Sequence, residues 1–205
     1  SHFANVENNG KFTVNIKKIS DMTNIGEQDT ASLAGAKFTL HYIDADESLG
    51  EYETDANGNI QLNYLPAGTY TLTETVPPNG YELPENPATT FTVDANGKVN
   101  GTNTNSVTIT NNRQTASLIV AKDVFCNVEQ SQGYEESLQP FQINIQLGNL
   151  NTPVEAEFTG TTAKTAAYNG NGLYTVQLGK DETATITGIP TGTKYTITET
   201  LGENH

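Results

Sequence analysis

The stretch LPAGTYTLTET, residues 65–75, decides the fold class, because apolar and polar residues alternate one by one after a Pro-Ala-Gly turn. Alternation with a period of two is typical of a β-strand whose two faces meet different surroundings. A related stretch, IPTGTKYTITET, occupies residues 189–200. Two such stretches about 125 residues apart predict two related modules.

The same alternation runs through the rest of the chain, and no segment keeps a helical period beyond two turns. The chain of 205 residues contains 31 Thr, 23 Asn and 18 Gly but no Trp, a composition that favours short strands joined by tight turns. We therefore predict an all-β chain. The further alternating segments are residues 11–18, 36–43, 89–94, 105–111, 117–122, 140–147, 172–178 and 183–189.

A short polar stretch, Asn112-Arg113-Gln114-Thr115, marks the boundary between the modules. We predict two tandem immunoglobulin-like β-sandwich modules, residues 1–113 and 114–205, joined as a stiff rod. Module one continues for 37 residues from Glu74 to Asn111, whereas six residues follow Glu199, so module two is expected to lack its last strand. Two explanations stay open: the intact protein continues into that strand, or a neighbouring molecule supplies it.

Two hairpin signals have the same sequence, Asp55-Ala-Asn-Gly58 and Asp94-Ala-Asn-Gly97. Their Asn-Gly pairs tolerate the positive φ angles of a type I′ turn, which predicts a tight hairpin at each position. Calcium binding at these acidic turns is the alternative, and the scarcity of neighbouring carboxylates disfavours it.

Charge and composition exclude several classes of function. A net charge of -14 and a pI near 4.4 argue against nucleic acid or an anionic membrane surface as the partner. One Cys excludes an intrachain disulfide framework and a cysteine-ligated zinc site, so we expect no metal and no cofactor. No apolar run is long enough to insert into a membrane. The three His residues are scattered: His2, His41 and His205.

Strand alternation places three polar residues of module one on rows that face the core. Lys18 continues the apolar row of the first strand, Glu74 continues that of TYTLTET, and Asn111 continues that of NSVTITN. Lys17 takes the place of Lys18 if the register slips by one residue. A single such lysine often extends its amine to solvent at a strand end, with its glutamate facing water. Repetition of the pattern in both modules favours the core.

Module two repeats the pattern with Lys122 and Glu199. Asn144 shares its strand face with Gln142 and Gln146 rather than with the apolar row. We therefore expect Lys122 to be unlinked within its own chain and buried beside Glu199.

Several ordered motifs resemble the B-type (CnaB-like) repeat domains of Gram-positive collagen adhesins and sortase-assembled pilins. The likeness covers nearly all of residues 11–113. In module two, SLIVAK, PFQINIQL and IPTGTKYTITET resemble a sister pilin module with a longer spacing between its first strands. The motifs of module one are LAGAKFTL (33–40), the turn at 55–58, LPAGTYTLTETVPPNGYEL (65–83) and VTITNN (107–112).

In that family, an internal isopeptide bond joins a first-strand lysine to a last-strand asparagine with the help of an acidic residue. The resemblance implies a Lys18–Asn111 cross-link assisted by Glu74, and in module two an acidic Glu199 beside Lys122. The physical chemistry agrees, since a free lysine with a pKa near 10.4 is almost fully protonated at neutral pH. Burial lowers a lysine pKa by up to roughly 3 to 5 units and raises that of a carboxyl, so the amine becomes a nucleophile.

The resulting prediction is a structural or adhesive stalk segment of a Gram-positive pilin or wall-anchored adhesin. Such a segment is secreted to the cell wall, has other pilus or surface-protein subunits as partners, and is not an enzyme. The alternative is a ligand-binding adhesin module whose loops, such as 21–32 and 127–139, recognise host matrix protein or glycan. An extracellular hydrolase would need paired carboxylates in a cleft or a neighbouring Ser and His, and neither stands out.

Three further sequence features were considered as signs of sortase attachment or thioester chemistry, and none of them supports either. Leu83-Pro-Glu-Asn-Pro87 lacks the Thr-Gly of a sortase sorting signal and is predicted to be a loop. Cys126 is predicted to be a buried small hydrophobic residue, because the tryptophan-containing glutamine motif expected with a thioester is missing. No Tyr-Pro-Lys segment of the kind found in shaft pilins is present, which weakens the case for a polymerising subunit.

Overall fold

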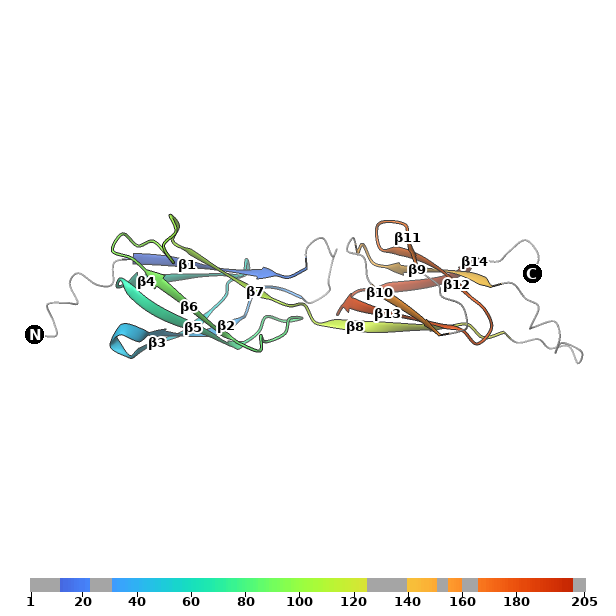
Figure 1. Ribbon diagram of the computed structural model, residues 1–205, viewed down its shortest axis with the longest axis horizontal. Helices are drawn as coiled ribbons and strands as arrows, with labels where there is room; N and C mark the ends of the chain where they lie inside the picture. The colour runs from blue at the N-terminus through green and yellow to red at the C-terminus, as the bar shows by residue number, and fades with distance from the viewer. Residues whose placement is uncertain (1–11, 23–30, 125–139, 151–154, 160–165, 201–205) are drawn as a thin grey trace, which may run out of the picture. The chain divides into compact units, whose positions relative to one another are not determined.

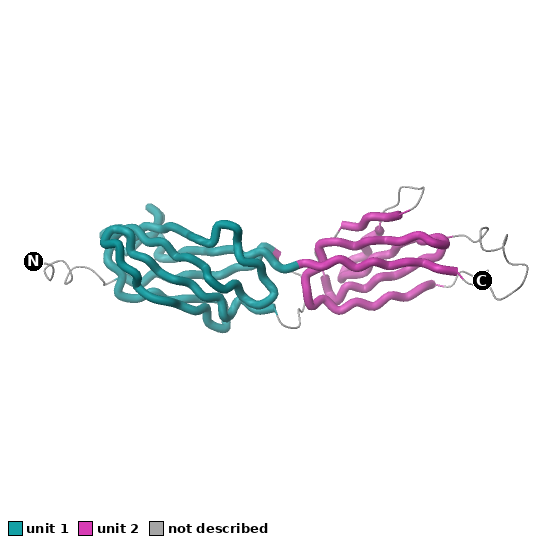
Figure 2. The backbone as a smooth tube through the Cα atoms, turned by 90° about the horizontal axis from the view of Figure 1, so that it is seen from below, with its two compact units in different colours: residues 1–21, 30–114 teal, residues 22–29, 115–205 magenta. Residues whose placement is uncertain are grey.

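The computed structural model describes residues 12–22, 31–124, 140–150, 155–159 and 166–200. The chain divides into two compact units (Figure 2): module one takes the described residues within 1–21 and 30–114, and module two those within 22–29 and 115–205. The described secondary structure is almost entirely β-strand (Figure 1), which confirms the all-β prediction. The expectations for Cys126, for loop 127–139 and for most of loop 21–32 lie outside the described residues.

Module one is a sandwich of two sheets with a shared core (Figure 1). One sheet has the order β4-β1-β7 and the other β3-β2-β5-β6. β1 runs antiparallel to β4 and parallel to β7, so the first and last strands of the module are neighbours. The strands are β1 (Phe12–Ser20), β2 (Lys37–Tyr42), β3 (Glu47–Glu53), β4 (Asn59–Leu65), β5 (Gly68–Val76), β6 (Ala88–Val93) and β7 (Ser106–Asn111), with a short 3-10 turn at Ile43–Ala45.

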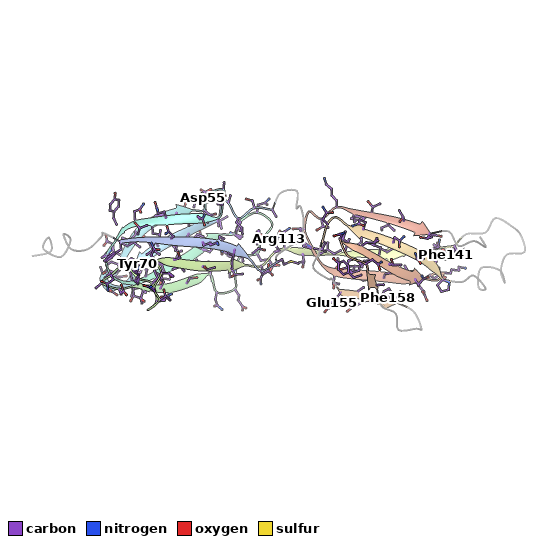
Figure 3. The ribbon with its side chains drawn as sticks, turned by 90° about the horizontal axis from the view of Figure 1, so that it is seen from above. Asp55, Tyr70, Arg113, Phe141, Glu155 and Phe158 are labelled. Atoms are coloured by element: carbon purple, nitrogen blue, oxygen red, sulfur yellow. The ribbon has the colours of Figure 1, made fainter. Side chains whose placement is uncertain are left out.

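The core of module one is filled by the apolar rows that strand alternation predicts. Tyr70 on β5, labelled in Figure 3, is fully buried. Its ring is stacked between those of Tyr42 and Phe91 at centroid distances of 4.9 and 5.3 Å. Its hydroxyl donates to the Pro66 carbonyl at 2.5 Å, so the one polar atom of this ring is satisfied. Burial raises the pKa of the Tyr70 hydroxyl, which is therefore a neutral packing group.

Module two is also built from two sheets, with the orders β10-β13-β8 and β11-β12-β9-β14. A second hydrophobic core lies between them and includes the fully buried Ile145, Leu147 and Leu178. The strands are β8 (Thr115–Ala121), β9 (Phe141–Leu147), β10 (Glu155–Thr159), β11 (Ala167–Tyr168), β12 (Leu173–Leu178), β13 (Thr183–Pro190) and β14 (Tyr195–Thr200).

The two Asp-Ala-Asn-Gly turns form at the predicted positions, but their turn type differs from the predicted one. In the first, the Asp55 carboxylate accepts the N–H groups of Asn57 and Asn59 at 2.8 and 2.9 Å, and the Gly58 N–H donates to the Asp55 carbonyl. Within this turn only Gly58 has a positive φ, of 79°, and the turn at 94–97 repeats the same bonds. The type I′ prediction is wrong because neither asparagine has the positive φ that this turn type requires; its backbone N–H instead donates to the aspartate carboxylate.

Candidate cross-linking site

The three polar residues predicted for the core of module one come together from two sheets. Lys18 on β1 and Asn111 on β7 lie on adjacent parallel strands, with Ser20 opposite Asn111 in the register. Glu74 is on β5 of the facing sheet and therefore reaches across the core. Lys17, the alternative for a slipped register, is exposed, whereas Lys18 is 1% exposed.

Glu74 contacts both of the groups that the predicted reaction would join. Its Oε1 lies 3.2 Å from the Lys18 amine, and the two side chains are 1% and 0% exposed. The Asn111 carboxamide nitrogen donates to both Glu74 oxygens, at 3.1 and 3.0 Å, and to the Glu82 carbonyl at 2.9 Å. One carboxylate thus touches the amine and the amide nitrogen, which is the geometry that proton transfer between them requires.

Burial changes the chemistry of the Lys18 amine. Loss of water around it lowers its pKa from 10.5, and this outweighs the opposing attraction of Glu74. The face of the Phe38 ring lies 5.3 Å from the amine. A lowered pKa enlarges the neutral, nucleophilic fraction of the amine at a given pH. Removing one partner from such a buried pair costs about 3–5 kcal/mol, because the other charge is left uncompensated.

The Asn111 carbonyl oxygen is buried, and it has no hydrogen-bond partner among the described residues. An unsatisfied group of this kind costs about 1–3 kcal/mol. The carboxamide is therefore held by its nitrogen end alone. A half-turn about its Cβ–Cγ bond would direct the oxygen towards Glu74, which can donate to it only when protonated.

Two backbone groups complete the site, and sequence reasoning missed both. The Gly58 carbonyl accepts the Lys18 N–H at 2.8 Å, and a Cβ atom on Gly58 would lie 3.3 Å from the Lys18 Cβ. The Glu82 carbonyl fixes the Asn111 amide, as described above. The Asn-Gly pair was a detectable signal for the first group, although it indicated only a turn. A backbone carbonyl carries no side-chain signal.

The loop at 83–87 is present as predicted, and part of it lines a pocket of about 350 Å³ with Glu82, Thr110 and Asn112.

Module two forms the corresponding ion pair in a more open setting. The Lys122 amine lies 3.0 Å from Glu199 and 4.3 Å from the centre of the Phe141 ring. The two charged side chains are 17% and 32% exposed, so the prediction of a buried pair is wrong. The reason is that β8 and β14 each have one edge without a described partner strand. Asn144 faces away from the pair and hydrogen-bonds Thr175 and Thr200.

No group of three or more His, Cys, Asp and Glu residues that could hold a metal ion occurs in the described ranges. His41 lies 3.0 Å from Asp46 in an exposed pair. No helix in these ranges is long and apolar enough to cross a membrane.

Residues 13–107 match a protein-family model described as SpaA, a prealbumin-like fold domain. Module one is thus similar to SpaA-type prealbumin-like domains. The match confirms the resemblance of this module to the domains of Gram-positive pilins. Residues 116–205 match a second family model, DUF7601, described as a domain of unknown function. No curated protein matches the chain.

Solved structures with similarity to the chain include three pilus proteins. The pilus 2b backbone protein of group B streptococcus is 30% identical over 50% of this chain and 41% of its own, with a TM-score of 0.39. GBS52, the minor pilin of Streptococcus agalactiae, is 22% identical over 52% and 46%, with a TM-score of 0.37. BcpA, the major pilin of Bacillus cereus, is 18% identical over 92% and 66%, with a TM-score of 0.40. The chain spans less than half the length of the first two.

Proposed function

We propose that the chain is a stalk segment of a Gram-positive pilus or wall-anchored adhesin, and that module one forms an isopeptide bond between Lys18 and Asn111. The observation that carries the proposal is the single buried carboxylate of Glu74, in contact with the amine and with the amide nitrogen. The SpaA-type match of residues 13–107 supports the structural role. Its partners are other pilus or surface-protein subunits at the cell wall.

The reaction balances within three side chains. The neutral Lys18 amine attacks the Asn111 Cγ and a new C–N bond forms. Glu74 takes a proton from the attacking nitrogen and passes it to the amide nitrogen of Asn111, with which it is already hydrogen-bonded. The Cγ–Nδ2 bond breaks and ammonia leaves. Each molecule reacts once, so the process is a maturation step and not enzymatic turnover.

The bond has a mechanical consequence. It joins β1 to β7 and closes a loop of about ninety residues, which stabilises the module by about 4–5 kcal/mol in the chain-entropy treatment of cross-links. A force that reaches the module through these two strands passes along the bond. The residues between them, roughly 300 Å long at about 3.4 Å each when extended, cannot then be pulled out.

Intact mass of the purified chain tests the proposal. We expect a mass lower than the sequence mass by one ammonia, and a branched tryptic peptide that joins Lys18 to Asn111. Lys18→Ala and Asn111→Ala should each restore the full sequence mass. Lys17→Ala is the matched control, because its exposed side chain lies on the opposite face of β1, and it should still lose ammonia. A full sequence mass for the unaltered chain, or separate unlinked peptides, would contradict the proposal.

A further inference from the structure

The Asn111 carboxamide is held by a second acceptor besides Glu74, the backbone carbonyl of Glu82. This carbonyl accepts the Asn111 Nδ2 at 2.9 Å, while the N–H of Glu82 donates to the Asn112 carbonyl at 2.8 Å. Both acceptors come from one stretch of chain, because β5 carries Glu74 and segment 80–82 follows it shortly afterwards. The Glu82 carbonyl is therefore fixed beside the end of β7, directly against the carboxamide.

Arg113, labelled in Figure 3, fastens segment 80–82 to the residues that follow β7. It is 3% exposed, its guanidinium donates to the Gly80 carbonyl, and it lies 5.2 Å from the centre of the Tyr81 ring. Its backbone forms an antiparallel bridge with Tyr81. The Gln114 N–H donates to the Gly80 carbonyl at 2.9 Å. Side-chain and backbone contacts thus hold the segment in one place.

The number of hydrogens on the Asn111 side chain distinguishes an amide from an acid at this site. Its NH2 group has two hydrogens and meets two acceptor groups, the Glu74 carboxylate at 3.1 and 3.0 Å and the Glu82 carbonyl at 2.9 Å. A carboxyl oxygen in the same place has one hydrogen when protonated and none when ionised. While Glu74 is ionised, an aspartate would leave at least one acceptor facing an oxygen with no hydrogen between them, which is unfavourable in a buried site.

The Glu82 carbonyl also sets the direction of the carboxamide. A half-turn of the Asn111 side chain would bring its oxygen to the position of Nδ2, against the Glu82 carbonyl, and two acceptors repel each other. As the group lies, the nitrogen that would leave as ammonia is hydrogen-bonded to Glu74, which would protonate it. The Glu82 side chain is exposed, so the contribution of this residue comes from its backbone.

We propose that the Glu82 carbonyl makes module one selective for asparagine over aspartate at position 111, and that Arg113 is the positioning residue that holds this carbonyl in place. The inference rests on the reaction proposed for module one and specifies its acceptor. With asparagine, the Lys18 amine attacks Cγ and ammonia leaves. With aspartate, the same C–N bond would form and water would leave. The site favours the first reaction because an amide nitrogen has a hydrogen for each acceptor, whereas a carboxyl oxygen does not.

The first measurement compares Asn111→Asp with the unaltered chain. Both full chains are isolated unfolded in denaturant and then refolded at neutral pH, and timed intact masses follow the loss of ammonia or of water. We expect Asn111→Asp to lose water about a hundredfold more slowly than the unaltered chain loses ammonia, because a buried acceptor is left without its donor. Hydrogen exchange of the β1 and β7 amides shows whether the variant is folded.

The second measurement tests Arg113. Arg113→Met removes the guanidinium and should slow ammonia loss about tenfold, because small displacements of reacting groups are costly. In a chain that also carries Asn111→Asp it should change water loss much less, so the ratio of the two rates narrows. Exchange of the Glu82 and Gln114 amides should become faster, since these N–H groups fasten the segment. Glu85→Ala is the matched control, because its exposed side chain is a nearby charge outside the site, and ammonia loss should keep its normal rate.

Three results would overturn the inference. The first is water loss from Asn111→Asp as fast as ammonia loss from the unaltered chain, and the second is ammonia loss at the normal rate in Arg113→Met. The third is a narrowed ratio with unchanged exchange of the Glu82 amide, which would assign the effect to the charge of Arg113. In each case an unaltered chain that loses ammonia leaves the proposed function intact. An unaltered chain that keeps its full sequence mass refutes the proposed function itself.

Discussion

In module one the lysine–glutamate pair is 0% and 1% exposed, and in module two it is 17% and 32% exposed, although the N–O distances are 3.2 and 3.0 Å. Both pairs arise in the same way, from a first-strand lysine and a glutamate on the facing sheet. Module one has two further strands at this place, β7 beside β1, which contributes Asn111, and β6 beside β5. Neither has a described counterpart in module two, where β8 and β14 are edge strands. Formation of the ion pair therefore depends on two strands, whereas its enclosure depends on their outer neighbours.

Enclosure matters because it acts on the reactivity of the amine. Water removed from around Lys18 lowers its pKa, and the same strand that removes the water brings the amide that the amine would attack. The acceptor strand thus supplies both the substrate group and the environment.

The largest expected effect comes from removing the carboxylate of each module in turn. Glu74→Gln should fold but keep its full sequence mass, because the amide cannot move a proton from the amine to the leaving nitrogen. Its melting temperature should fall by on the order of 20 °C, since a lost cross-link is worth about 4–5 kcal/mol. Glu199→Gln should still lose one ammonia relative to its own sequence mass, and the melting of module one should be unchanged. Intact mass and calorimetry measure both.

Asn111→Ala separates the cost of losing the cross-link from the cost of leaving the buried Lys18 without its ion-pair partner. It removes the acceptor but keeps the Lys18–Glu74 pair, so its loss of stability reports the cross-link, while Glu74→Gln adds an uncompensated buried lysine. Glu74→Gln should therefore melt below Asn111→Ala. Equal melting temperatures would show that the buried charge costs nothing, and ammonia loss in Glu74→Gln would remove Glu74 from the mechanism.

Much of this site could be predicted from strand alternation alone. A period of two assigns Lys18, Glu74 and Asn111 to inward-facing rows, and a one-residue slip would have exposed them, as it exposes Lys17. The proximity of β1 and β7 was implied by the family resemblance, because local pattern does not specify which strands pair. The site residues could thus be named before their distances were known.

The same rule failed in module two for a physical reason. Alternation assigns a face to Tyr195 and Ile197, but burial also requires something to cover that face, and β14 is an edge strand among the described strands. The type of the Asp-Ala-Asn-Gly turns was likewise missed because a side-chain contact from Asp55 determines the backbone angles. Both the exposure of these side chains and the type of the turns thus depend on neighbouring groups, which the alternation of residues within one strand does not specify.

The second-largest expected effect is the pH dependence of the rate of ammonia loss. Because the pKa of Lys18 lies below 10.5, the neutral amine fraction rises about tenfold per pH unit and then levels off before 10.5. Ammonia loss after refolding from denaturant should follow this curve in the unaltered chain and in Lys122→Ala. In Asn111→Ala the folded state binds fewer protons than the unfolded state between the lowered pKa and 10.5, so its stability should increase as pH rises through that window. A rate independent of pH would argue against amine deprotonation as the controlling step.

The smallest expected effect concerns the position of Lys18 and uses the two identical turns as a matched pair. Gly58→Ala adds a Cβ 2.8 Å from the Leu33 Cβ and 3.3 Å from the Lys18 Cβ, whereas a Cβ on Gly97 would meet the Phe12 ring. The two glycines have φ of 79° and 77°, so the backbone strain of an alanine is the same in both turns. A displaced amine should slow ammonia loss on the order of tenfold in Gly58→Ala, because small misplacements of reacting groups are costly. Gly97→Ala should react at the normal rate despite its own packing strain. Refolding followed by timed mass measurement gives both rates, and equal slowing in the two variants would mean that turn strain, not lysine position, controls the reaction.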